Sequence, residues 1–309
     1  MRTDAARSAG WKRPLRAVRG WPPFSFLVAH SVRAVLRAGG WNSEWAIRHI
    51  HRVGSVSAAL PNGRVLRLWS RGDDWVSNQV FWRGWAGHEP ETTRLFFRLA
   101  QQAAVTVDVG AYVGYYTLLA AHANPSGRVI ALEPLPAIHE RLLRHVALNR
   151  LPHVECVRAA AGAEEGTASF YHHRTGLPTS SSLSRSFMGD GEDVLATPVP
   201  LVTLDGLLRR CGVDRLDLLK MDTESTEPAV LDGAAETVKR DRPWILCEVL
   251  KARGAERRLE ELLGSLGYRF FLLTPNGPQP RSSIEGHPSW LNYLFAPQER
   301  AVLKEWRAV

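Results

Sequence analysis

The stretch VTVDVGAYVGYYTLLAAHA, residues 105–123, passes from a short apolar run through two glycines into a longer apolar segment. The run before Gly110 is typical of a buried strand, and the segment from Tyr115 onward is typical of a helix. Glycines at positions 110 and 114 permit a tight turn in which a ligand approaches the backbone. The start of the following helix offers free N–H groups to such a ligand. The stretch therefore predicts a strand, a ligand-binding turn and a helix.

A carboxylate follows at the end of the next apolar run, RVIALE, where Glu133 lies 25 residues after Asp108. In a doubly wound sheet these two strand ends lie side by side, so Glu133 can accept hydrogen bonds from the two hydroxyls of a ribose. A dinucleotide fingerprint requires three glycines as GxGxxG, whereas this turn has two glycines spaced four apart. Asp108 disfavours a pyrophosphate and favours a cationic ligand such as a sulfonium. We expect a cationic adenosine derivative, with an NAD(P) or sugar-nucleotide enzyme as the alternative.

The remaining chain from residue 105 alternates apolar runs with helical stretches. The expected strands are 105–110, 128–133, 154–159, 215–222, 244–250, 268–273 and 290–295, with two further β-like pieces at 167–173 and 197–204. Apolar strands interleaved with helices predict an α/β fold whose mostly parallel sheet is covered on both faces. No helix separates the last two strands, which predicts an antiparallel pair at the end of the sheet. The Ser- and Gly-rich loop 174–196 is typical of a lid.

The basic charge is confined to the first part of the chain. The 309 residues carry a net charge of +8, and residues 1–60 hold ten Arg or Lys against Asp4 and Glu44. A neutral body argues against a groove that follows nucleic-acid phosphates. Eight of the eleven tryptophans also lie in the first 85 residues, beside amphipathic helical patterns over 24–52. We expect a helical cap there, with membrane-surface contact or homodimer formation as the alternatives.

Composition and segment patterns also bound the location and the domains. Three scattered cysteines and no apolar segment long enough to span a bilayer favour a cytoplasmic protein, either free or peripheral to the inner face of a membrane. No signal-peptide cleavage site is evident. We expect a basic helical extension at 1–60, a β-hairpin and helix cap at 61–103, a catalytic domain at 104–300 and a tail at 301–309.

Several motifs occur in an order that resembles the FkbM family of S-adenosylmethionine-dependent methyltransferases. They are DVGAYVGYYT, ALEP, VALN, VTLD, LLKMDTESTE, LDGA and NYLFAP, spread over about residues 78–297. The resemblance implies a Rossmann-like class I methyltransferase sheet of seven strands with the last one antiparallel. It also implies O-methylation of a hydroxyl on a sugar, a glycan or a polyketide-type small molecule.

The resemblance also assigns roles to individual residues. Asp108, Gly110 and Glu133 would hold the cofactor, and Asp222, Glu224 and Glu227 occupy the second acidic motif. The full predicted cofactor-binding set is Glu89, Asp108, Gly110, Ala111, Tyr112, Gly114, Glu133, Pro134 and Asp222. Two positions depart from the family pattern, which usually has Asn at the position of Tyr112 and Gly at that of Ser225. If a positive φ is needed at 225, Ser225 is either strained there or forces a different turn.

The predicted catalytic residues are carboxylates that follow two adjacent strands. Asp222 is the last residue of RLDLLKMD, Glu224 lies two residues further on, and Glu248 lies near the end of WILCEVL. The carboxyl ends of parallel strands share one crevice, so these groups should meet there. One of them would act as the general base for an alcohol, with Asp222 the first candidate and His172 or His173 as alternatives. The same three oxygens suit a divalent cation, although no spacing pattern requires one. A protein that binds the cofactor without catalysis is the remaining alternative.

Overall fold

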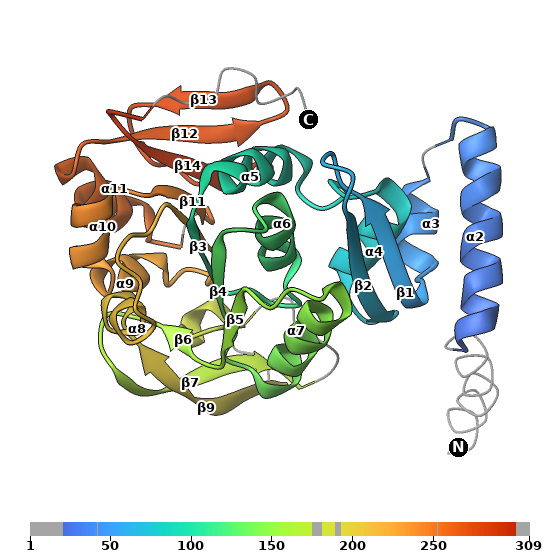
Figure 1. Ribbon diagram of the computed structural model, residues 1–309, viewed down its shortest axis with the longest axis horizontal. Helices are drawn as coiled ribbons and strands as arrows, with labels where there is room; N and C mark the ends of the chain where they lie inside the picture. Colours follow the sequence, from blue (N-terminus) through green and yellow to red (C-terminus); the bar gives the residue numbers. More distant parts are fainter. Residues whose placement is uncertain (1–20, 42, 175–180, 189–192, 252, 301–309) are drawn as a thin grey trace, which may run out of the picture. The chain divides into compact units, whose positions relative to one another are not determined.

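The computed structural model describes residues 21–41, 43–174, 181–188, 193–251 and 253–300 (Figure 1). The contacts divide the chain into two compact units, Met1–His88 and Glu89–Val309. This division after His88 lies earlier than the predicted boundary after residue 103, because helix α5 (Pro90–Gln102) belongs to the second unit. Residues 301–309, predicted as a tail, lie outside the described residues.

The first unit is built from short helices and one hairpin. Its elements are α2 (Pro22–Ala38), α3 (Glu44–His49), β1 (Val53–Ala59), β2 (Val65–Arg71) and α4 (Trp75–Arg83). Strands β1 and β2 pair antiparallel from Val53 opposite Arg71 to Ala59 opposite Val65. The expected turn at Pro61-Asn62-Gly63 therefore forms, with Gly63 at a φ of +79°. The predicted boundary after residue 60 falls at the turn of this hairpin.

Helix α2 buries a polar position and exposes apolar ones. Ser25 and Ala29 are its buried residues, whereas Leu27 and Val35 are more than 60% exposed. Two hydrogen bonds explain why Ser25 is buried. Its hydroxyl accepts from the N–H of Val53 at 2.8 Å and donates to the carbonyl of His51. Membrane-surface contact and homodimer formation stay predictions. Within the described residues, no helix has both the length and the apolar content needed to cross a bilayer.

The second unit contains a mixed sheet of eight strands, most of them parallel. Its strand order is β13-β12-β14-β11-β10-β3-β4-β5, within the part of the chain that the structure describes. The parallel strands are β3 (Val105–Val109), β4 (Arg128–Leu132), β5 (Val154–Val157), β10 (Leu218–Met221) and β11 (Trp244–Glu248). Strand β14 (Asn292–Pro297) lies antiparallel between β11 and β12 (Tyr268–Thr274). The predicted seven strands form, including the antiparallel last strand, and an eighth joins them.

The eighth strand is β13 (Gly277–Arg281), which pairs antiparallel with β12. Its sequence is GPQPR, which we interpreted as a connecting loop because proline cannot donate to a strand ladder. The strand has a neighbour on one side only, so the missing N–H groups of Pro278 and Pro280 are tolerated there.

Helices cover both faces of this sheet (Figure 1). Helices α5, α6 (Tyr115–Ala123) and α7 (Pro136–Asn149) lie on one side. The other side carries α8 (Leu204–Arg210), α9 (Glu227–Asp232), α10 (Ala235–Asp241) and α11 (Glu256–Ser265). Apolar residues of the strands and of the second group of helices form one continuous core, in which Val107, Leu219 and Ile245 are fully buried. Burial of the strands on both faces explains their near-continuous apolar sequence.

A smaller sheet of four strands follows β5 in the chain. It has the order β6-β9-β7-β8 and contains β6 (Ala160–Ala161), β7 (Gly166–His173), β8 (Ser181–Ser182) and β9 (Val194–Val202). The two β-like pieces of the sequence are thus β7 and β9. The predicted loop 174–196 is partly ordered, because it contributes β8, a short 3₁₀ helix (Arg185–Met188) and the start of β9. Its residues 175–180 and 189–192 lie outside the described residues.

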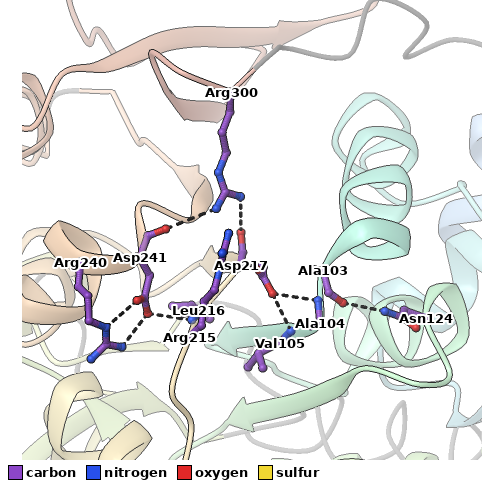
Figure 2. Close-up of polar contacts among 10 residues, drawn as sticks. All are labelled: Ala103, Ala104, Val105, Asn124, Arg215, Leu216, Asp217, Arg240, Asp241 and Arg300. Carbon is purple, nitrogen blue, oxygen red and sulfur yellow. Dashed lines mark hydrogen bonds and ion pairs between the residues drawn. The ribbon is translucent and has the colours of Figure 1, made fainter.

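A network of hydrogen bonds lies at the amino-terminal ends of the central strands of the main sheet (Figure 2). Asp217 Oδ2 accepts hydrogen bonds from the N–H groups of Ala104 at 2.9 Å and Val105 at 3.2 Å. Asp241 Oδ2 accepts from the N–H of Leu216 at 2.8 Å. These carboxylates satisfy backbone donors where β3 and β10 begin, so they fix the starts of the two central strands. The functional residues lie at the other end of those strands.

Candidate active site

The strand order reverses between β3 and β10. From β3 the chain proceeds through β4 to β5 on one side, and from β10 it proceeds to β11 on the other. In open α/β sheets, ligands bind beyond the carboxyl ends of the strands at such a reversal. The predicted residues Asp108, Glu133, Asp222 and Glu248 lie at or directly after these ends. The fold therefore brings the predicted site to one edge.

The glycine turn packs against the chain that follows β10. Gly110 has a φ of +78°, and a Cβ at that position would overlap the backbone carbonyl of Asp222. Gly114 has a φ of +89°, and a Cβ there would overlap the side chain of Leu142 on α7. Gly110 is thus required by packing against backbone as well as by its conformation, whereas at Gly114 the positive φ is the main constraint because the end of the Leu142 side chain can move. Tyr112, between them, adopts a φ of +51°, which explains why a residue such as Asn is favourable at this position.

Glu133 is held rigidly beside the turn. Its Oε2 accepts from the N–H of Tyr112 at 3.1 Å, and its Oε1 accepts from the N–H of Leu135 at 2.9 Å. Burial raises the pKa of Glu133 to about 7, against the lowering effect of these two hydrogen bonds. Each carboxylate oxygen keeps a further lone pair for a hydroxyl donor. The geometry therefore suits recognition of a ribose at the end of β4.

Asp108 is a buried residue of the candidate site. It is 2% exposed and accepts from the hydroxyl of Thr117 on α6 at 2.6 Å. Its register partner on β10 is Lys220, so the two side chains lie on neighbouring strands. Burial raises the pKa of Asp108 to about 6, while the Thr117 hydroxyl and the Lys220 charge act in the opposite direction. Asp108 therefore contributes charge to the site, with one of its oxygens already bound by the protein.

A chain of polar contacts connects α5 with β10. The Tyr116 hydroxyl donates to Glu89 Oε2 at 2.6 Å, and Lys220 Nζ lies 4.8 Å from the centre of the Tyr116 ring. Lys220 Nζ also donates to Asp222 Oδ2 at 3.1 Å. Burial lowers the pKa of Lys220, but the carboxylates of Asp222, Glu89 and Asp108 outweigh this and raise it. Lys220 is thus a buried ammonium ion surrounded by carboxylates.

The three predicted catalytic carboxylates meet. Asp222, Glu224 and Glu248 each present one oxygen, and these oxygens lie within 4.8 Å of one another. Burial, followed by repulsion from Asp222, raises the pKa of Glu224 to about 8. The same two causes raise the pKa of Glu248 well above its normal value. The cluster can therefore hold a proton near neutral pH or bind a cation.

The turn that carries Glu224 is conformationally strained. Glu224 has a φ of +56° and Ser225 a φ of +81°, so two consecutive residues other than glycine occupy the left-handed region. Glu227 Oε1 supports the turn by accepting from the N–H groups of Thr223 and Ser225. The hydroxyl of Ser182 in β8 donates to the carbonyl of Glu224 at 2.7 Å. The strain expected at Ser225 is confirmed, and the predicted lid segment contacts this turn.

The alternative candidates lie elsewhere. His172 is on β7, where its Nε2 lies 2.9 Å from the hydroxyl of Thr197 on β9, so it has a structural partner in the small sheet. Trp82 is 8% exposed within the first unit, and its indole N–H donates to the carbonyl of Ile50. These contacts favour structural roles for both residues.

Sequence reasoning missed several residues of the site. Lys220, Tyr116 and Thr117 all contact a predicted acid, and Asn292 is the register partner of Glu248. Lys220 is the third residue of an otherwise apolar strand, LLKM. The sequence offered this signal, because a lysine is rarely found on a strand that is buried on both faces.

The fold and the site define a class I methyltransferase architecture, and comparison with known proteins identifies the family. The model of the FkbM methyltransferase domain matches residues 108–270, and the chain belongs to this family. The methyltransferase sdnD of Sordaria araneosa is 26% identical over 188 residues, which cover 52% of this chain and 72% of that protein. The 31-O-demethyl-FK506 methyltransferase FkbM of Streptomyces tacrolimicus is 26% identical over 249 residues, covering 71% of this chain and 90% of that protein.

Among solved structures, the methyltransferase FkbM from Methylobacillus flagellatus KT is similar, with 16% identity and a TM-score of 0.40. The match covers 62% of this chain and 43% of that one, so this chain spans less than half of that protein.

The match to this family confirms three predictions: the family itself, the methyltransferase fold and S-adenosylmethionine as the methyl donor. The residues present fit that donor. Glu133 is fixed by two backbone N–H groups and keeps lone pairs that can accept from hydroxyl groups. The carboxylates around Lys220 form an environment that favours a sulfonium and an ammonium group. The individual cofactor-binding roles stay predictions for the whole set, which is Glu89, Asp108, Gly110, Ala111, Tyr112, Gly114, Glu133, Pro134 and Asp222.

Proposed function

We propose that this protein is an O-methyltransferase that modifies a hydroxyl of a sugar, a glycan or a polyketide-type small molecule. The observation that carries the proposal is the convergence of Asp222, Glu224 and Glu248 at the carboxyl ends of the strands, where Glu133 also lies. The names of relatives add support, because the Streptomyces tacrolimicus relative is a methyltransferase of 31-O-demethyl-FK506. The same set of residues provides binding for the donor and a base for an alcohol.

Methyl transfer to an alcohol requires alignment and removal of a proton. S-adenosylmethionine, when bound, supplies an electrophilic methyl group. The acceptor oxygen must approach that carbon in line with the departing sulfur, and water must be excluded. The acceptor O–H bond breaks as its oxygen forms the bond to carbon, and a carboxylate takes the proton.

Glu224 is the residue that we assign to this proton. It is partly exposed, so an acceptor can reach it, and its pKa of about 8 is close to the pH at which a base works best. Asp222, the first candidate from the sequence, is occupied on Oδ2 by Lys220 and is better suited to fix that ammonium group. Ser182 and Glu227 hold the Glu224 turn in position.

We also propose a reducing, cytoplasmic location. The three cysteines, Cys156, Cys211 and Cys247, are all free thiols in the structure. Free cysteines persist in reducing compartments.

Transfer of a deuterated methyl group from S-adenosylmethionine to a panel of glycosides and hydroxylated polyketides tests the proposal. Mass spectrometry should detect the label on an acceptor oxygen. E224Q should lose turnover by about 100-fold or more while it keeps cofactor affinity. E236Q, which removes an exposed carboxylate on α10, is the matched control and should keep full activity. A label on nitrogen or carbon would contradict O-methylation. Cofactor binding with no transfer to any acceptor would favour a non-catalytic protein.

A further inference from the structure

Two buried oxygens at the acidic cluster have no hydrogen-bond partner. Glu248 is 8% exposed and Asn292 is 5% exposed, and neither Glu248 Oε2 nor Asn292 Oδ1 has a partner. A buried acceptor without a partner costs roughly 1–3 kcal/mol, and more when it is charged. Such atoms indicate that a ligand completes the site.

The sheet register places the two residues side by side. Glu248 ends β11 and Asn292 begins β14, and they are direct antiparallel partners. Opposite residues on antiparallel strands project to the same face with Cβ atoms about 5 Å apart. One oxygen of Glu248 already lies within 4.8 Å of oxygens from Asp222 and Glu224. Asn292 therefore adds a neutral amide oxygen beside Glu248, which belongs to the cluster of three carboxylates.

We propose that Asp222, Glu224, Glu248 and the amide oxygen of Asn292 bind one hard divalent cation, Mg²⁺ or Mn²⁺. Carboxylate and amide oxygens are the protein ligands that these ions prefer. The charge balance agrees, because Lys220 pairs with Asp222, and both Arg253 and Lys220 act on Glu224. Glu248 has no bonded cation among the described residues. The charges of Asp222, Glu224 and Glu89 act on it, and that of Lys220 only partly offsets them.

The competing arrangement is a simple hydrogen bond. If the amide of Asn292 is turned by half a rotation, its NH₂ group faces Glu248 and satisfies both residues without an ion. The two arrangements predict opposite effects for N292D. A carboxylate at 292 strengthens a cation site, whereas it repels Glu248 if no cation binds.

The role of the ion rests on the proposed function. An acceptor hydroxyl that occupies a further coordination position has a lowered pKa. The proton of such a hydroxyl would pass to the oxygen of Glu224 that does not hold the ion. Its oxygen lone pair would form the new bond to the methyl carbon as the carbon–sulfur bond of the donor breaks. The ion thereby orients the acceptor and stabilises its developing negative charge.

Titration of the full chain with Mn²⁺, followed by electron paramagnetic resonance of the free ion, tests the site directly. We expect one saturable site per chain that Mg²⁺ displaces. E248Q and N292L should weaken Mn²⁺ binding by at least about tenfold. N292D should bind Mn²⁺ as tightly as the wild type or more tightly, and E236Q should be unchanged. Circular dichroism of each variant confirms that it is folded.

Two outcomes would overturn the cation site. One is that no saturable Mn²⁺ binding occurs at millimolar concentration. The other is that the N292D variant binds no ion and melts at a lower temperature than the wild type. A parallel titration with S-adenosylhomocysteine separates this failure from failure of the proposed function. Cofactor binding without Mn²⁺ binding rejects only the cation site, and Mn²⁺ binding without cofactor binding rejects only the proposed function.

Discussion

The ammonium group of Lys220 lies 3.1 Å from Asp222 Oδ2, although Lys220 is completely buried. Asp108 lies beside Lys220 in the sheet register, and Tyr116 covers the ammonium group with its ring. A buried charge is tolerated only when it is paired. Lys220 thus allows several carboxylates to gather where β3 and β10 end, while the negative charges still outnumber it.

We predict that Lys220→Met destabilises the protein by about 3 kcal/mol, because it leaves Asp108 and Asp222 without their buried partner. Chemical denaturation monitored by circular dichroism measures this change. Lys220→Arg, which restores the charge, should recover part of the loss. Equal stability of Lys220→Met and wild type would show that the carboxylates do not depend on the ammonium group.

The raised pKa of Glu133 predicts that the stability of the protein depends on pH. Burial raises its pKa from 4.5 to about 7, so the folded protein binds a proton more tightly than the unfolded chain. The resulting stability is present below pH 4.5 and is lost as the pH rises to about 7, a difference of about 3 kcal/mol. Glu133→Gln should flatten this part of the stability profile, measured by urea denaturation from pH 4.5 to 8. A profile that keeps the wild-type slope in the variant would contradict the assignment.

Ser225 provides a test of backbone strain. Its φ is +81°, and its hydroxyl oxygen is buried with no hydrogen-bond partner. Ser225→Gly should stabilise the protein by about 1–2 kcal/mol, because glycine adopts this conformation without a steric cost. Ser225→Ala removes the hydroxyl but keeps the Cβ, so it should recover only part of that gain. Thermal melting distinguishes the two effects, and destabilisation by Ser225→Gly would refute the strain.

Asp217 separates stability from function. It accepts from the N–H groups of Ala104 and Val105 at the edge of the sheet that is remote from the site (Figure 2). Asp217→Ala leaves two backbone donors without this partner and should cost about 2–3 kcal/mol. The dissociation constant for S-adenosylhomocysteine, measured at a temperature where the variant is folded, should stay within about twofold. A larger change would mean that this edge is coupled to the site.

Local patterns were sufficient to predict the main architecture. Apolar runs identified the seven strands, and the glycine turn with Glu133 identified the cofactor edge, because buried parallel strands and positive-φ turns restrict residue type strongly. The meeting of Asp222, Glu224 and Glu248 was also predictable, since parallel strands bring their carboxyl ends together.

Other features depend on pairing between distant segments. The prolines of β13 are compatible with an edge strand, but only the sheet order shows that this segment is at an edge. Asn292 becomes part of the site through its register with Glu248, 44 positions earlier in the chain, which no local pattern specifies. The burial of Ser25 depends on its hydrogen bond to Val53.

Calorimetric titration of the full chain with S-adenosylhomocysteine and, separately, with NAD⁺ tests the central claim most directly. We predict one saturable site for S-adenosylhomocysteine, weakened about tenfold or more in Glu133→Gln because a charge-assisted hydrogen bond contributes roughly 1.5–3 kcal/mol. NAD⁺ should give no saturable heat, because Asp108 and Asp222 repel a pyrophosphate at this edge. Tighter binding of NAD⁺ than of S-adenosylhomocysteine would contradict the account.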